Sequence, residues 1–189
     1  SGSYENFEYQ KTDTEVTITK YNGPTGANVD VVIPAVVDGL QVTKIGSGTA
    51  GTDETAGVFA ESDTVVLRSL TIPEGVVQLL ENAFVRLRVE EPVQIPSTVV
   101  SVGYGCFNGF DGRVTFSEGG NLFYIGPYAF RDVKFDGVLV LPEGITTIDR
   151  GGFYSADASA VILPDTIEKI FDSAFYQPNY LIKIFVPSS

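Results

Sequence analysis

The chain has 189 residues, of which 24 are acidic and 12 are basic, so its formal net charge is −12. This charge argues against nucleic acid and anionic membrane surfaces as partners, because both attract a basic face. The single cysteine excludes a disulfide framework, and the absence of histidine removes Ser-His and Cys-His nucleophile pairs and most catalytic zinc sites. No run of 18 apolar residues occurs, so we expect no membrane insertion.

The length of 189 residues fits one domain or a short repeat array. Residues 1–3 read Ser-Gly-Ser and resemble an engineered remnant, so we exclude them and assign residues 4–189 to a single domain. Within it, residues 4–60 are expected to form an N-terminal cap and an irregular first repeat, and residues 61–189 regular repeats. No secretory signal peptide is visible in this sequence.

The first elements along the chain are irregular copies of the later ones. Residues 15–21 alternate apolar and polar side chains and predict an opening strand or capping hairpin, with a turn at 22–24. Residues 31–34 match the strand of the later repeats, and 42–46 match their second extended piece. Residues 47–57 are rich in Gly, Thr and acidic side chains and predict a surface loop.

From here on, one pattern recurs every 22 or 23 residues. Its phenylalanines are Phe84, Phe107, Phe130, Phe153 and Phe175. Prolines keep the same period at 73, 96, 142, 164 and 187, and Ser117 stands where one proline would fall. From proline to phenylalanine there are 11 residues in four repeats, but 13 after Ser117, where Gly119-Gly120 suggests an insertion.

Each repeat predicts a short strand that ends at the proline, a turn, and a second extended piece that leads to the phenylalanine. Residues 138–141 (Val-Leu-Val-Leu) illustrate the strand, whose period-two pattern places alternate side chains on one face. A repeat this short buries its apolar face only by stacking on its neighbours. We therefore expect about seven rungs whose strands form one parallel sheet about 30 Å wide, with the phenylalanines in an interior column.

The run I-P-x-x-V-x-x-I-G-x-x-A-F, read here as IPSTVVSVGYGCF over residues 95–107, resembles the BspA-type (Treponema pallidum) leucine-rich repeat. The resemblance covers residues 16–187. It implies a β-rich leucine-rich-repeat solenoid with little helix. It also implies a bacterial protein that is extracellular or on the cell surface, often an adhesin, with no catalytic residues and no cofactor.

Several residue groups invite a chemical interpretation, and a structural one is favoured for each. Cys106 occupies the small position before Phe107 and is expected to be a buried, inert thiol. The loop 52–55 (Thr-Asp-Glu-Thr) lacks a calcium-loop pattern, so we expect no metal site. Acidic residues recur just after the strand prolines, at Glu74, Glu143 and Asp165. A carboxylate enzyme would need two such groups in a cleft, whereas Pro-Glu-Gly favours tight turns.

The outward positions of the strands change character along the array. They are polar in the first half, where Gln94 and Arg113 stand, and apolar in the second, where the set is Val138, Val140, Ile162 and Phe185. Solvated strand positions should stay polar, and contiguous exposed apolar residues often mark a contact site. We therefore predict that these six residues bind a partner. An adjoining segment that covers the strip, or selection by β-propensity alone, would also explain the pattern.

These features favour a non-catalytic binding module for a protein or glycan ligand on another cell or matrix. A structural spacer in a larger surface protein is the alternative, and it would need only uniformly polar sides. A carboxylate-based glycan-active enzyme is the third, and it would need a cleft that a short solenoid rarely supplies. The sequence does not determine the oligomeric state.

Overall fold

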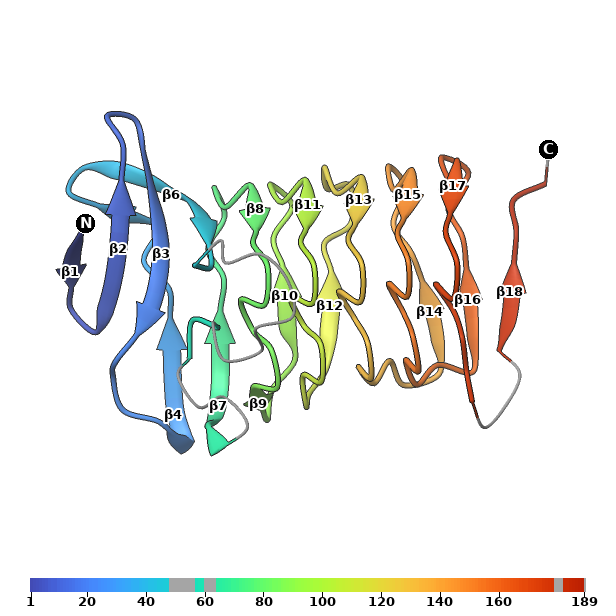
Figure 1. Ribbon diagram of the computed structural model, residues 1–189, viewed down its shortest axis with the longest axis horizontal. Helices are drawn as coiled ribbons and strands as arrows, with labels where there is room; N and C mark the ends of the chain where they lie inside the picture. Colours follow the sequence, from blue (N-terminus) through green and yellow to red (C-terminus); the bar gives the residue numbers. More distant parts are fainter. Residues whose placement is uncertain (48–56, 60–63, 179–181, 189) are drawn as a thin grey trace.

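The computed structural model describes residues 1–47, 57–59, 64–178 and 182–188, which form a β-solenoid of about seven turns (Figure 1). The two termini lie at opposite ends of the elongated molecule (Figure 1). Within these ranges the chain forms strands and turns and no α-helix, so none is available to cross a membrane. The predicted fold class is confirmed.

Short strands make up nearly all of the regular structure. They are β1 (Gly2–Tyr4), β2 (Phe7–Lys11), β3 (Glu15–Tyr21), β4 (Gly26–Val32), β5 (Val36–Val37), β6 (Leu40–Ile45), β7 (Val66–Thr71), β8 (Gln78–Leu79), β9 (Arg88–Val89), β10 (Val93–Ile95), β11 (Ser101–Val102), β12 (Val114–Phe116), β13 (Tyr124–Ile125), β14 (Val138–Val140), β15 (Thr147–Ile148), β16 (Ala160–Ile162), β17 (Lys169–Ile170) and β18 (Lys183–Phe185). The opening strand that the sequence predicts over residues 15–21 is β3.

The arrangement of the sheets differs from the prediction. The continuous sheet is built from the extended pieces after each proline, in the order β1-β2-β3-β6-β8-β11-β13-β15-β17, with β5 paired to β6. The strands before the prolines, predicted to form one parallel sheet, form three instead: β4-β7-β9, β10-β12 and β14-β16-β18. That part of the prediction is wrong, and the array has a break on each side of β10-β12.

Local sequence accounts for both breaks. Pro92 precedes β10 next to β7, and a proline has no N–H to donate to a neighbouring strand. At the second break, Arg113 and Lys134 form an isolated parallel bridge. β12 begins one residue after Arg113, but β14 begins four residues after Lys134. The extra residues 135–137 include Gly137 at φ +78°, and they put the two strands out of step.

The interior column of phenylalanines is confirmed. Phe107, Phe130 and Phe153 are fully buried, and successive ring centroids lie 5.4 and 5.2 Å apart with the rings within 11° of parallel. Phe175 continues the stack 5.4 Å beyond Phe153, at an interplanar angle of 3°. Stacked rings of this size contribute both buried area and ring–ring attraction to every interface between rungs.

The small residue before each phenylalanine belongs to a main-chain ladder between rungs. The amide of each phenylalanine donates to the carbonyl of the small residue in the next rung, as in Phe107 N–Ala129 O at 2.8 Å and Phe130 N–Gly152 O at 2.8 Å. Cys106 occupies such a position and is fully buried, as predicted. Close approach also explains Gly126, because a Cβ there would lie 2.8 Å from the carbonyl oxygen of Val102.

The N-terminal end of the core is covered by an antiparallel cap. β2 pairs with β3 and places Phe7 and Tyr9 among the buried residues, and the Phe7 ring packs on Tyr21 at 5.1 Å. Gly2 and Ser3, which the sequence analysis excluded from the domain, belong to β1 and pair with β2. Main-chain pairing places few demands on side chains, so their composition gave no signal.

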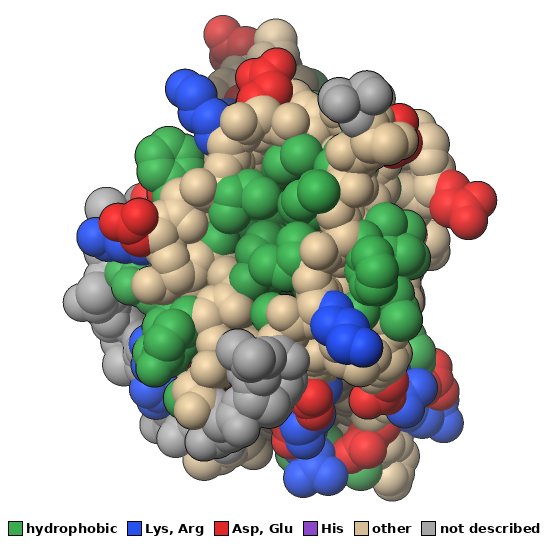
Figure 2. Space-filling view, turned by 90° about the vertical axis from the view of Figure 1, so that its right-hand side faces the viewer, with side chains coloured by type: hydrophobic (Ala, Val, Ile, Leu, Met, Phe, Trp, Pro, Cys, Tyr) green, Lys and Arg blue, Asp and Glu red, His purple; other side chains and the backbone are tan. Residues whose placement is uncertain are grey.

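The C-terminal end of the array exposes core-type side chains. Ile170, Phe171 and Ile184 are all exposed, and Val186 has 72% of its surface accessible. Figure 2 looks onto this end and shows hydrophobic side chains gathered at its centre. Ile184 is the register partner of Val161, which in turn pairs with Leu139, and both of those side chains are buried. The side chains at the C-terminal end are exposed because no further rung packs on this last turn within the described residues.

Candidate interaction surface

The four apolar residues predicted to face outward lie together on the sheet formed by β14, β16 and β18. Val140, Ile162 and Phe185 are register partners on β14, β16 and β18, so they lie side by side, one strand spacing apart. Their exposed fractions are 60%, 40% and 54%. Val138 lies two residues before Val140 on the same face and is also exposed. We call Val138, Val140, Ile162 and Phe185 the outer strip.

One flanking residue of this face behaves differently from its neighbours. Ala160 pairs with Val138 on one side and with Lys183 on the other, yet only 6% of its surface is accessible. A methyl group between two longer side chains contributes little accessible surface. The exposed apolar surface of the strip therefore comes from the larger side chains and not from Ala160.

Gln94 and Arg113, the predicted polar half, lie on the other side of a sheet break. Gln94 is exposed on β10 and pairs with Thr115 of β12, and Arg113 immediately precedes β12. The structure therefore brings the apolar residues together on one sheet and the polar residues together on another. Val32 on β4 holds the same outward position in the first rung and is 63% exposed. The sequence analysis did not identify it, although it stands two residues before Pro34 as the others precede theirs.

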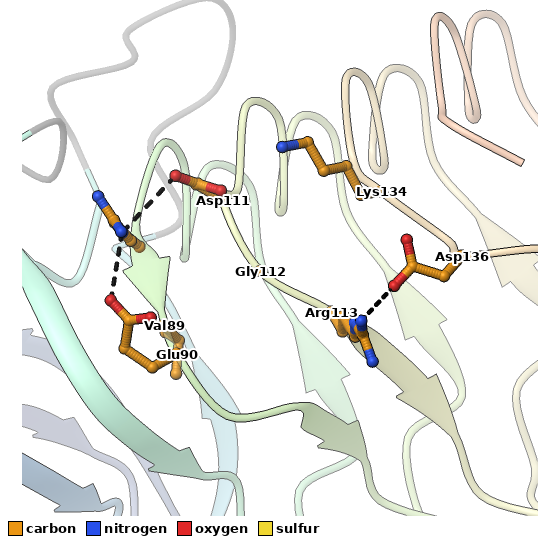
Figure 3. Close-up of a pocket in the computed structure, with 8 residues that line it drawn as sticks. Val89, Glu90, Asp111, Gly112, Arg113, Lys134 and Asp136 are labelled. Atoms are coloured by element: carbon orange, nitrogen blue, oxygen red, sulfur yellow. Dashed lines mark ion pairs between the residues drawn. The ribbon is translucent and has the colours of Figure 1, made fainter.

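A charged cavity of about 280 Å³ opens next to the second break (Figure 3). Arg88 lies 3.3 Å from a carboxylate oxygen of Glu90 and 3.8 Å from one of Asp111, and Arg113 pairs with Asp136. Lys134 also lines the cavity, and none of the ion pairs found among the described residues includes it. These groups are all exposed, so water screens them.

This cavity was not predicted from the sequence, although a repeating pattern of charge marks its position. The fourth residue after each of four successive phenylalanines is charged, with alternating sign: Arg88, Asp111, Lys134 and Asp157. Isolated parallel bridges join Arg88 to Asp111 and Lys134 to Asp157. A column of alternating charge along a solenoid is expected to hold neighbouring rungs in register.

Two of the acidic residues after the strand prolines, Glu74 and Glu143, serve as turn caps. Glu74 accepts hydrogen bonds from the main-chain amide of Ser97 at 3.2 Å and from its hydroxyl at 2.8 Å. Glu143 accepts one from the amide of Asp165 at 3.1 Å. Each carboxylate thus ties its turn to the next rung, which agrees with the turn interpretation of these residues.

Metal-binding and thiol chemistry find little support in the described part of the chain. No three His, Cys, Asp or Glu side chains there are placed to hold a metal ion. The loop 52–55, considered above for calcium, lies outside the described residues. Burial raises the pKa of the Cys106 thiol far above its usual range, so the reactive thiolate form is suppressed.

Comparison with known proteins agrees with this fold. The family model described as the BspA type leucine rich repeat region matches residues 56–182 in 6 copies. Among curated proteins, none matches the chain.

Three solved structures show the same architecture. A leucine rich cell surface protein from Faecalibacterium prausnitzii is 21% identical, with a TM-score of 0.62, and the match covers 99% of this chain and 54% of that one. A leucine-rich repeat protein from Bacteroides ovatus is 20% identical, with a TM-score of 0.65 and coverage of 98% and 52%. The T. pallidum leucine rich repeat protein is 19% identical, with a TM-score of 0.59 and coverage of 97% and 85%. The chain therefore spans about half the length of the first two, and at these identities the likeness concerns the fold alone.

Proposed function

Because this chain belongs to the family of BspA-type leucine-rich repeat proteins, we propose that it is a non-catalytic binding module of a secreted or cell-surface bacterial protein. Its ligand would be a protein or glycan on another cell or matrix. The similar F. prausnitzii protein is described as a cell surface protein, which supports the proposed location.

The observation that carries the proposal is the outer strip. Val140, Ile162 and Phe185 are large, apolar and contiguous on three paired strands, and they are exposed where a solvated sheet is expected to be polar. Burial of apolar surface contributes about 25 cal/mol per Å², so covering the strip would contribute several kcal/mol before the cost of association. A structural spacer gains nothing from such a strip.

The test is a double variant, Ile162→Ser with Phe185→Ser, screened with the unaltered protein on an array of host proteins and glycans. Both side chains are exposed and lie outside the core, so the melting temperature should change little. Binding to the array should fall at least about tenfold, as loss of about 1.4 kcal/mol of contact energy would produce.

Val32→Ser is the matched control, because it removes an exposed apolar side chain at the same repeat position away from the strip. It should bind the array like the unaltered protein. If the double variant folds and binds every ligand as before, the strip is incidental and the spacer function gains. If it unfolds, the assignment of these positions to the outer face is wrong.

A further inference from the structure

The break between β12 and β14 leaves main-chain groups without strand partners. β12 pairs only with β10, and β14 pairs only with β16. No main-chain hydrogen bond joins β12 to β14, and both strands lie wholly within the described residues. Each strand therefore presents an edge in the middle of the array, where a solenoid would ordinarily have none.

The direction of the existing hydrogen bonds shows which groups face the break. The amide of Ser117 donates to Ile95, at 3.3 Å, so Phe116, one residue earlier, directs its N–H and C=O to the opposite side. The amide of Leu141 likewise donates to Ile162, at 3.0 Å, so the N–H and C=O of Val140 point away from β16. Phe116 and Val140 thus offer donors and acceptors to the break from its two sides.

The two strands at the break are farther apart than paired strands. Most Cα–Cα pairs between β12 and β14 are separated by more than 8 Å, whereas most pairs between the hydrogen-bonded strands β10 and β12 are closer. Adjacent strands in a sheet lie about 4.8 Å apart, so a strand inserted between two others separates them by about 9.6 Å.

The space between the two strands is a cavity of about 270 Å³ with an aromatic floor. The rings of Phe116 and Phe135 line it, 6.4 Å apart and nearly parallel at 12°. Thr115 lies on one side, and Val138 and Val140 lie on the other. Such a site suits a chain whose inward side chains are apolar and whose outward ones are short.

One end of the cavity carries an excess of positive charge. Arg113, Lys134 and Asp136 line it, so two cations face one carboxylate, in a chain whose formal net charge is −12. Asp136 is already paired with Arg113, and none of the ion pairs found among the described residues includes Lys134. A partner with a carboxylate at the corresponding position would complement it.

We propose that the break between β12 and β14 binds an extended peptide, which adds as a β-strand and carries an acidic residue at the end near Lys134. Strand addition of this kind takes affinity from main-chain hydrogen bonds and specificity from alternate side chains. The inference deepens and rests on the proposed function, because Arg113, Val138 and Val140 belong to the same face and the ligand class becomes a peptide. The other break, between β7 and β10, is lined by Pro92 and Pro96, which have no N–H, so it suits a strand less well.

The test is selection from a displayed library of eight-residue peptides with apolar residues at alternate positions and all other positions random. The selected peptides are then measured against Val140→Pro and Val140→Thr. Proline removes the N–H that faces the break while leaving the bonds to β16 intact, and threonine keeps that N–H on a side chain of similar shape. We expect Val140→Pro to weaken binding at least about tenfold and Val140→Thr to change it less than about twofold.

Methylation of the peptide's own amides tests the same bonds with the protein unaltered. Methyl groups at either set of alternate residues should weaken binding strongly, because a strand between two parallel neighbours directs one set of amides to β12 and the other set to β14. Selection of no peptide above background, or of peptides that bind Val140→Pro normally and tolerate every methylation, would overturn the proposal. The peptide experiments could fail while the Ile162/Phe185 double variant still loses binding to the array of proteins and glycans. That result would support the proposed function and show that its ligand does not bind as an added strand.

Discussion

Removal of one ring from the interior column should have a large and calculable effect. Phe130 is fully buried between Phe107 and Phe153, whose ring centroids lie 5.4 and 5.2 Å from its own. The Phe116 ring lies 5.6 Å away, centroid to centroid, at an interplanar angle of 68°. Replacement of a buried phenylalanine by alanine costs about 3 to 5 kcal/mol. Because Phe130 loses stacking on both faces as well as buried area, we expect Phe130→Ala to fall at about 4 to 5 kcal/mol.

The measurement is urea denaturation followed by circular dichroism, together with thermal melting. For a chain of this size the loss corresponds to a fall in melting temperature of about 10 to 20 °C. Phe123→Ala is the control, since Phe123 is 48% exposed and its removal should change the unfolding free energy by less than about 0.5 kcal/mol. A Phe130→Ala variant that melts like Phe123→Ala would refute the interior column and the repeat alignment with it.

Three further predictions concern the Cys106 thiol, the Asp30 carboxylate and metal binding. Cys106 should resist thiol reagents in the folded protein and react fully in denaturant, because burial raises its pKa; rapid labelling under native conditions would contradict its burial. Arg68 and then Ser69 hold the pKa of Asp30 at about 2, below its ordinary 3.8, so their stabilising effect is present above about pH 4 and is lost as the pH falls through about 2. The difference in unfolding free energy between the unaltered protein and Asp30→Asn should therefore shrink over that interval, and a constant difference would refute the pairing. Titration with zinc in a calorimeter should give no stoichiometric tight binding, and a saturable isotherm would show a site that the described residues do not reveal.

The sequence predicted the parts of the fold that depend on strict recurrence. The phenylalanine spacing placed the interior column, and the period-two pattern of residues 138–141 placed Val140 outward and Leu139 inward, as observed. Both follow from local geometry that each rung repeats, so one sequence contains several independent copies of the signal.

The sheet breaks depend on small departures from the repeat and were missed. From Phe107 to Ser117 there are 10 residues, against 12 from Phe130 to Pro142. From the sequence, the irregularity was predicted only as an insertion after Ser117, near Gly119-Gly120. In the structure the shift lies before the strand, where residues 135–137 separate β14 from β12.

The ends of the array are the other place where the repeat pattern misleads. Ile184 and Val186 have the same spacing as buried residues in earlier rungs, but burial requires a following rung. Periodicity identifies the face on which a side chain lies and gives no information on what covers that face. The alternating charges four residues after Phe84, Phe107, Phe130 and Phe153 were equally periodic, and a comparison of that position across the repeats would have identified them.

The most direct test of the binding face is hydrogen exchange measured by mass spectrometry, with and without the tightest ligand recovered from the protein and glycan array. If the outer strip is the contact surface, the ligand should slow exchange in peptides that cover β14, β16 and β18, and leave β2 and β3 unchanged. Protection confined to the N-terminal cap, or to the turns on the far side of the solenoid, would contradict the assignment of binding to this face.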